Sequence, residues 1–233
     1  MNIDSTLDRL ISENILKENA DQKSKHVSSG KLSASILGWP LQWQILKYLG
    51  VPAVPFDEYV LRMFLRGRHV EEYIVSQMAN AQKQVLVEYK GCVGYLDALW
   101  NEEVREVKSV KNSKYSMINK NKEADPQHKL QGAYYAIGLN KPYYFIDYVA
   151  ADDYRVSSFK YETNEIKPEV EAIISAYQEA IEKQIVPKFV ARYKWQESAQ
   201  YNNYPEFMTA SPEKIKQLLV KYNVSWEMKN NGK

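Results

Sequence analysis

The sequence predicts an α/β (α+β) fold, in which a central sheet is flanked by helices and helical extensions lie at both ends. Two observations support this prediction. Runs rich in β-branched and aromatic residues, typical of strands, cluster at 85–110 and 143–161. Segments with apolar residues at helical spacing precede, separate and follow these runs. A chain of 233 residues is long enough to bury one sizeable core.

The N-terminal part is predicted to be helical. Asp4-Ser5 can cap a first helix, which is expected to give way to a polar loop at about Ala20. A second helical pattern, Ser33 to Tyr48, is interrupted by Gly38-Trp39-Pro40. Asp57 is then expected to begin a long helix through about Gln82. The core stripe of this helix is predicted to comprise Val60, Met63, Phe64, Gly67, Val70, Ile74 and Met78.

Three strands are predicted next, at Val85 to Tyr89, Cys92 to Trp100 and Val104 to Val110. The segment Asn101-Glu102-Glu103 is short and polar enough to join the last two as a hairpin. Lys111 to Ala124 is expected to form a loop.

A sharp helix start is predicted at Asp125-Pro126, because aspartate caps helices and proline suits the first helical position. This helix is expected to end near Gly138. The remaining predicted elements are strands at Tyr143 to Val149 and Tyr154 to Tyr161, and helices at Pro168 to Val186 and Ser211 to Tyr222.

Composition excludes several classes of function. The net charge is +2 with a pI of about 8.3, so any surface that binds nucleic acid must be local. The single cysteine, Cys92, excludes a disulfide framework and a cysteine-ligated iron–sulfur cluster, and it fits a reducing compartment. The sequence contains no secretory signal pattern and no apolar run long enough to span a bilayer. We therefore expect a cytoplasmic protein that does not bind membranes.

The predicted hairpin brings acidic groups together. Side chains alternate along a strand, so Glu106 and Lys108 share one face while Val107 points to the other. Asp97 lies on the paired strand at about the same height, and directly opposed residues in a hairpin are only about 5 Å apart. Two carboxylates this close repel each other. A hard divalent cation bound through oxygen would remove that repulsion.

These residues resemble a known family. Gly94-x-x-Asp97 followed by Glu106-x-Lys108 is similar to the signature of the PD-(D/E)XK nuclease superfamily. The segment Gln131 to Tyr135 matches the Q-x-x-x-Y element of its RecB-like branch, which includes phage-type exonucleases and CRISPR-associated nucleases. Gly67 to Glu72 resembles the helix of that branch that carries an extra histidine, here His69.

The resemblance implies a restriction-endonuclease-like core, with a central mixed sheet, at about residues 33–161. Residues 1–233 would form a single domain, with helical extensions at 1–32 and 162–233. Some relatives place cysteines for an iron–sulfur cluster near both ends. This chain has Trp39-Pro40 and Tyr201-Asn202-Asn203-Tyr204 there, so aromatic packing could join its ends instead.

The resemblance also implies a role for each site residue. The ligands of a Mg²⁺ or Mn²⁺ ion would be His69, Asp97, Glu106 and the carbonyl of Val107. Lys108 would orient the attacking water or stabilise the transition state. Gln131 and Tyr135 would position the waters of the cation and the scissile phosphate.

A lysine-rich segment follows the acidic pair. From Lys108 to Lys122 there are five lysines and no acidic residue. The four predicted to contact DNA phosphates are Lys111, Lys114, Lys120 and Lys122. Composition alone favours a solvated loop without that role, whereas the position directly after the acidic pair favours contact with phosphates to about the same degree.

Together these observations predict a metal-dependent DNA nuclease of phage or bacterial type, and the RecB-like pattern favours an exonuclease. DNA recombination and repair would be its setting, with a recombination or replication protein as partner. Two alternatives stay open. One is a catalytically inactive module on the same fold that binds DNA ends or a protein, and the other is an RNA-directed nuclease.

Overall fold

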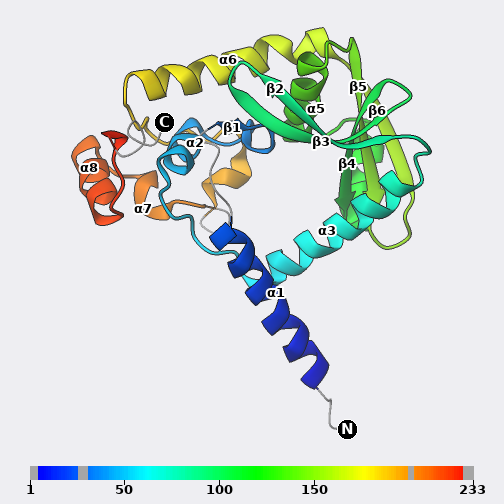
Figure 1. Ribbon diagram of the computed structural model, residues 1–233, viewed down its shortest axis with the longest axis horizontal. Helices are drawn as coiled ribbons and strands as arrows, with labels where there is room; N and C mark the ends of the chain where they lie inside the picture. Colours follow the sequence, from blue (N-terminus) through cyan, green and yellow to red (C-terminus); the bar gives the residue numbers. More distant parts are fainter. Residues whose placement is uncertain (1–4, 26–30, 199–201, 228–233) are drawn as a thin grey trace.

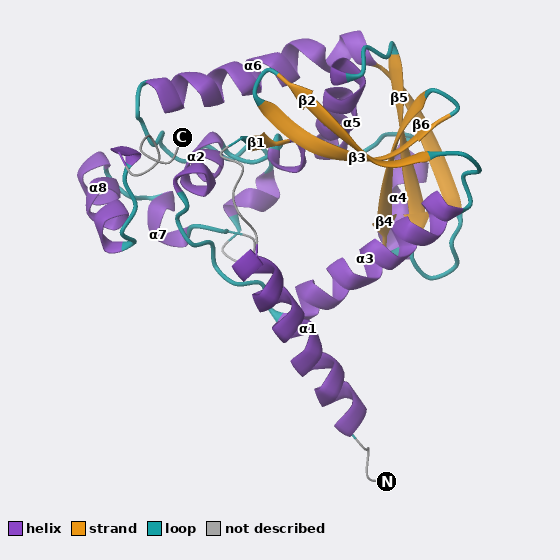
Figure 2. Ribbon diagram, in the orientation of Figure 1, coloured by secondary structure: helices purple, strands orange, loops and turns teal. Residues whose placement is uncertain are grey.

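A computed structural model describes residues 5–25, 31–198 and 202–227. Its strands form one mixed sheet (Figure 2). They are β1 (Leu32–Ser33), β2 (Gln82–Tyr89), β3 (Cys92–Trp100), β4 (Glu103–Val110), β5 (Tyr143–Ala150) and β6 (Val156–Glu162). Their order is β1-β3-β4-β5-β6, with β2 also paired to β3. The pairs β1–β3 and β4–β5 are parallel and the other pairs antiparallel, which confirms the predicted mixed sheet.

Helices flank this sheet, as predicted (Figure 1). They are α1 (Thr6–Lys25), α2 (Leu41–Leu49), α3 (Glu58–Ser76), α4 (Asn112–Asn121), α5 (Pro126–Gly138), α6 (Thr163–Glu182), α7 (Pro205–Met208) and α8 (Pro212–Lys221), with 3-10 turns η1 (Ala34–Ile36) and η2 (Lys194–Glu197). None of the helices in the described part of the chain has the length and apolar character needed to cross a membrane.

Helices α3 and α5 cover opposite faces of the sheet. Val149 packs with Val70 of α3, whereas Tyr148, the next residue along β5, lies in the larger core with α5. Gly132 allows α5 to approach closely, because a Cβ atom there would lie 2.5 Å from Cδ2 of Tyr144.

The hairpin between β3 and β4 forms as predicted. Asn101 and Glu102 both have positive φ, 50° and 62°, as a two-residue type I′ turn requires. The turn sets a register in which Trp100 pairs with Glu103 and Ala98 pairs with Arg105.

The prediction for the long helix was wrong in two respects. Helix α3 ends at Ser76, because Gln82 already belongs to β2 and pairs with Leu99. Its buried residues include Val70 and Val75, whereas Phe64 is 48% exposed. The reason is that α3 crosses the sheet only with its C-terminal half, while its N-terminal half extends beyond the sheet to meet α1 (Figure 1).

The predicted loop at Lys111 to Ala124 is also wrong, because most of it forms α4. Two apolar residues, Tyr115 and Ile118, anchor one side of this helix in the core. The Tyr115 hydroxyl lies 2.7 Å from Oγ of Ser157, which ties α4 to β6. Helix α6 likewise begins before Pro168, since Oγ1 of Thr163 donates to the Lys141 carbonyl at 2.8 Å and fixes the first residue of the helix.

The segment that contains α2 meets the C-terminal segment on the side away from the sheet, where α2, α7 and α8 lie together (Figure 1). The Gln42 amide donates to the carbonyls of Pro187 and Phe207, at 3.0 and 3.2 Å. Trp43 packs on Phe189 with ring centroids 5.8 Å apart, and the Val54 N–H donates to the Asn203 carbonyl at 3.0 Å. Aromatic and amide contacts therefore join these two segments, while Tyr201 lies outside the described residues.

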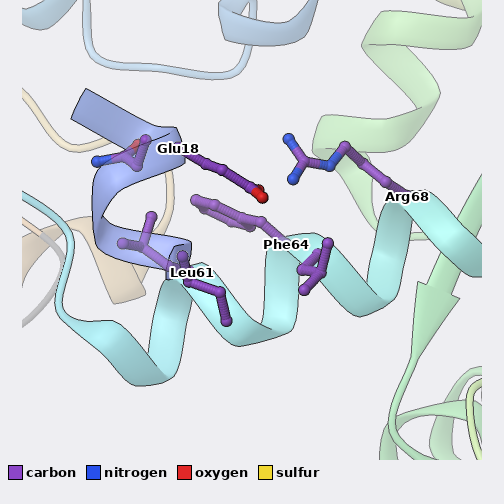
Figure 3. Close-up of a pocket in the computed structure, with 7 residues that line it drawn as sticks. Glu18, Leu61, Phe64 and Arg68 are labelled. Atoms are coloured by element: carbon purple, nitrogen blue, oxygen red, sulfur yellow. The ribbon is translucent and has the colours of Figure 1, made fainter. Parts of the chain in front are cut away.

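Helix α1 packs against α3 and otherwise projects from the body (Figure 1). Ile15 is buried at their junction. Figure 3 shows a small pocket there, lined from α1 by Glu18 and from α3 by Leu61, Phe64 and Arg68.

Candidate active site

Asp97 lies where β3 and β4 diverge. The ladder between the two strands reaches Ala98 and Arg105. Beyond that pair, Oδ2 of Asp97 accepts a hydrogen bond from the Val107 N–H at 2.8 Å. The Asp97 side chain thus takes the place of the backbone carbonyl that would accept from Val107 if the ladder between β3 and β4 continued. This bond fixes the Asp97 carboxylate close to Glu106, the residue that the hairpin register sets opposite it.

Glu106 is fully buried. Its Oε1 bonds to the Lys108 ammonium, but its Oε2 has no hydrogen-bond partner among the described residues. Burial, reinforced by the charge of Asp97, raises the pKa of the Glu106 carboxyl to about 8. A buried carboxyl oxygen without a partner is costly, so this position favours a cation.

Helix α3 adds a third acid, Glu71, which the sequence analysis missed. Its carboxyl is hydrogen-bonded to Asp97 and also accepts from Nε2 of Gln84 at 3.0 Å. Burial, followed by the charge of Asp97, raises the Glu71 pKa to about 7. Burial also raises the pKa of Asp97, against the opposing charge of Lys108. The contact between the two carboxyls raises the pKa of Glu71 and lowers that of Asp97, so Glu71 is the donor in it.

His69 is not brought to this cluster by any contact among the described residues. Its side chain is 67% exposed, and Nδ1 lies 3.9 Å from Oε2 of Glu72. Two residues along a helix correspond to about 200° of rotation, so His69 and Glu71 point to different sides of α3. The ligand role of His69 stays a prediction.

Lys108 is the cation of the cluster. Burial alone would lower its pKa, but the charges of Glu106 and Asp97 outweigh that effect and raise it. The side chain therefore stays an ammonium that partly neutralises three carboxyl groups.

Helix α5 supplies Gln131 and Tyr135 from the face of the sheet that it covers. The Gln131 amide lies 3.4 Å from the Tyr135 hydroxyl. Burial and then the charge of Glu106 raise the pKa of Tyr135, so its hydroxyl stays protonated beside the acids. Gly94 makes this approach possible, because a Cβ atom there would lie 2.9 Å from the Tyr135 hydroxyl oxygen.

A cleft of about 910 Å³ opens over the cluster, between α3 on one side and β4, α4 and α5 on the other. Glu71, Lys108 and Gln131 line its base. Four further cationic side chains line it: Arg66, Arg68, Lys111 and Lys114. Both signs of charge therefore meet in one concave site.

The structure thus divides the four predicted phosphate contacts. Lys111, bonded to the Tyr59 hydroxyl, and Lys114, 3.5 Å from Oδ2 of Asp125, line the cleft. Lys120 and Lys122 are at the far end of α4 and lie outside the described lining of the cleft.

The donor set fits a hard divalent cation. Within the described ranges, no three His, Cys, Asp or Glu side chains have the spacing of a formed metal site. Glu71, Asp97 and Glu106 nevertheless converge, each with its pKa raised first by burial, and Oε2 of Glu106 is unpartnered. All-oxygen ligands suit Mg²⁺ or Mn²⁺. The second oxygen of the Glu106 carboxyl, Oε1, accepts the hydrogen bond from the Lys108 ammonium.

Neither the family models nor the curated proteins give a match to this sequence. Solved structures do match. LHK-Exo in complex with dAMP, an alkaline exonuclease from Laribacter hongkongensis, has a TM-score of 0.51 at 15% identity and covers 66% of this chain and 89% of its own. SSO0001 has a TM-score of 0.52 at 17% identity and covers 80% of this chain and 90% of its own. The predicted resemblance is confirmed for the fold, which this chain shares with both structures.

Proposed function

From a fold shared with an exonuclease, we propose that this chain is a metal-dependent DNA nuclease, and an exonuclease rather than an endonuclease. One observation carries the proposal. The fully buried Glu106, with an unpartnered oxygen, is bonded to Lys108, and Lys108 and Glu71 line a cleft with cationic walls. An acidic base suits a cation, and cationic walls suit the phosphates of a nucleic acid.

Different residues would have different roles in phosphodiester hydrolysis. Glu71, Asp97, Glu106 and the Val107 carbonyl would hold the cation. Bound there, it would supply the Lewis acidity that activates water and neutralises charge on the phosphate. The Lys108 ammonium donates to the attacking water and stabilises the negative charge that develops in the transition state. Gln131 and Tyr135 donate hydrogen bonds that orient the scissile phosphate.

The same cluster argues against a module that only binds. Three converging carboxyl groups with raised pKa values cost stability unless a cation joins them. A surface that merely holds DNA or a protein gains nothing from them. We further propose DNA recombination and repair as the setting, with a recombination or replication protein as partner.

End-labelled linear DNA and closed circular DNA, each incubated with Mg²⁺, Mn²⁺ or EDTA, test this function. We expect the linear DNA to be shortened with either metal, the circle to survive, and EDTA to stop the reaction. A circle that is cut contradicts exonuclease action. Cleavage of a matched RNA alone would favour the RNA-directed alternative, and binding without any cleavage would favour the inactive module.

A further inference from the structure

One side of α3 lines the cleft along most of its length. Tyr59, Met63, Gly67 and Glu71 follow one another at intervals of four residues, and all of them line the cleft. Residues four apart share one face of a helix. At about 1.5 Å per residue, the distance along α3 from Tyr59 to Glu71 is about 18 Å. The stripe therefore runs from the mouth of the cleft to the acidic cluster.

The outer end of this stripe is aromatic and exposed. Tyr59 is 55% exposed and Phe64 is 48% exposed, and Phe64 meets Phe56 edge-on with ring centroids 5.1 Å apart. The Lys111 ammonium lies 5.2 Å from the centre of the Tyr59 ring and bonds to its hydroxyl. The Lys111 ammonium therefore lies beyond the hydroxyl, at the edge of the Tyr59 ring, and does not cover a face of the ring. The exposure of Tyr59 leaves room for a flat partner to stack on that ring.

Phe64 connects this aromatic end to the charged residues of α3. Figure 3 shows its ring rising from the helix toward α1, with the Arg68 side chain farther along the same helix. Phe64 and Arg68 also line the cleft. An aromatic platform beside guanidinium and ammonium groups suits a ligand that offers both flat rings and negative charge.

No packing contact among the described residues requires a glycine at position 67, in the middle of the stripe. A Cβ atom at this position would meet no described atom within 4 Å. Glycine is a poor helix former, so alanine would be the better residue if the wall needed only stability. Because glycine has no side chain, nothing projects from this position into the cleft between the aromatic end and the acidic end of the stripe.

We propose that this stripe is a track for single-stranded DNA. An unpaired base stacks on Tyr59 at the mouth of the cleft, the strand passes over Gly67, and a phosphate reaches Glu71 and Lys108. The track deepens and rests on the proposed function, since it takes the acidic end as the place of cleavage. Inside a duplex, both faces of each base are covered by its neighbours, so beyond the terminal pair only an unpaired base can present a face to Tyr59. At a duplex rise of about 3.4 Å per nucleotide, the track spans about five nucleotides at most.

An abasic scan tests the track. The full-length Glu106→Gln variant is used so that the DNA is not cut. It is titrated with single-stranded oligonucleotides that carry one abasic residue, moved stepwise from the end, which removes a base and keeps its phosphate. We expect weaker binding at a single position within about five nucleotides of the end, by about 5- to 150-fold, the loss expected from one base–aromatic stack.

Variants on the same helix give the controls. In the Glu106→Gln background, Tyr59→Ala should abolish the abasic effect, whereas Tyr59→Phe should retain it because the ring remains. Tyr73→Ala should also retain it, since Tyr73 is 52% exposed on α3 but outside the described lining of the cleft. Gly67→Leu should weaken binding of every oligonucleotide, and Gly67→Ala should weaken it less.

An abasic effect that is absent at every position, or unchanged by Tyr59→Ala, overturns the track. So does tighter binding of a blunt duplex than of the single strand. Cleavage by the wild-type protein is measured separately. A protein that shows the localised abasic effect but cuts no DNA keeps the track and loses the nuclease function. A protein that cuts linear DNA without that effect keeps the nuclease function and loses the track.

Discussion

At the scale of single residues, the acidic cluster is predictable only where its geometry is local. Asp97, Glu106 and Lys108 come together because a two-residue turn fixes the register of one hairpin. Glu71 reaches the same place only because of the way α3 docks on the sheet. Docking depends on contacts distant in sequence, such as Val70 on Val107, which no local pattern encodes.

The pKa of Glu106 predicts a pH dependence of stability. Its folded pKa of about 8 lies above the ordinary value of 4.5, so between these values the folded protein holds a proton that the unfolded chain has lost. Stability therefore falls as pH rises from about 4.5 to about 8. In EDTA, the melting temperature of Glu106→Gln should fall less from pH 5 to pH 8 than that of the wild type. Glu182→Gln, a change at an exposed glutamate, is the control and should behave like the wild type. Equal falls in melting temperature for Glu106→Gln and the wild type would contradict the raised pKa of Glu106.

Glu71 and His69 form a matched pair for testing which α3 residue serves the metal. Glu71→Gln should raise the Mn²⁺ concentration that gives half-maximal cleavage, because Glu71 contacts Asp97. His69→Ala should raise it less, since the His69 side chain is 67% exposed. Activity titrated against Mn²⁺ for both variants, with melting curves, decides between them. A larger effect at His69, without loss of stability, would support the ligand role implied by the RecB-like resemblance.

At the scale of elements, composition misled the prediction at α4. Its lysines, serines and asparagines are typical of a loop, and only the spacing of Tyr115 and Ile118 indicated a buried side. The strands were easier, because runs rich in β-branched and aromatic residues predict β3, β4 and β5, and nearly every residue of these strands is at least partly buried. The end of α3 could not be predicted, since the pairing of Gln82 with Leu99 decides it.

Helix α4 separates the four predicted phosphate contacts into two testable pairs. The double variant Lys111→Gln/Lys114→Gln should weaken the salt dependence of binding to single-stranded DNA. The slope of log binding constant against log salt concentration should become shallower by about 0.7 for each phosphate that is no longer neutralised. Lys120→Gln with Lys122→Gln removes the same charge outside the lining of the cleft and should change the slope less. Binding measured from low to moderate salt gives the slopes. Equal changes for both pairs would mean that α4 binds phosphates along its whole length.

Helix α3 offers a prediction in which stability and function oppose each other. Gly67→Ala should stabilise the helix by up to about 1 kcal/mol, since no described atom obstructs the new Cβ. For a chain of this size, that gain would raise the melting temperature by about 2–4 °C. Thermal unfolding measures it. A fall in melting temperature would show that Gly67 is required for packing and would remove one support of the proposed track.

At the scale of the whole molecule, the fold places a charged cleft between α3 on one side and β4, α4 and α5 on the other. The sheet supplies Asp97 and Glu106, and α3, which supplies Glu71, spans from the sheet to α1 (Figure 1). The segment that contains α2 meets the C-terminal segment elsewhere, through Gln42, Trp43 and Asn203. Trp39 in the first segment and Asn203 in the second indicated this junction in the sequence, but the hydrogen bonds that form it join residues more than a hundred positions apart.

The most direct measurement is cleavage of end-labelled linear DNA, titrated with Mn²⁺, by the wild-type protein and by Asp97→Asn. This substitution keeps the size of the side chain and removes its charge, so the hydrogen bond from the Val107 N–H can persist. The wild type should shorten the DNA in a saturable, EDTA-sensitive manner, and Asp97→Asn should remain inactive at every Mn²⁺ concentration while melting at or above the wild-type temperature. Near-normal cleavage by Asp97→Asn, or wild-type cleavage that continues in EDTA, would contradict a cation-dependent nuclease built on this cluster.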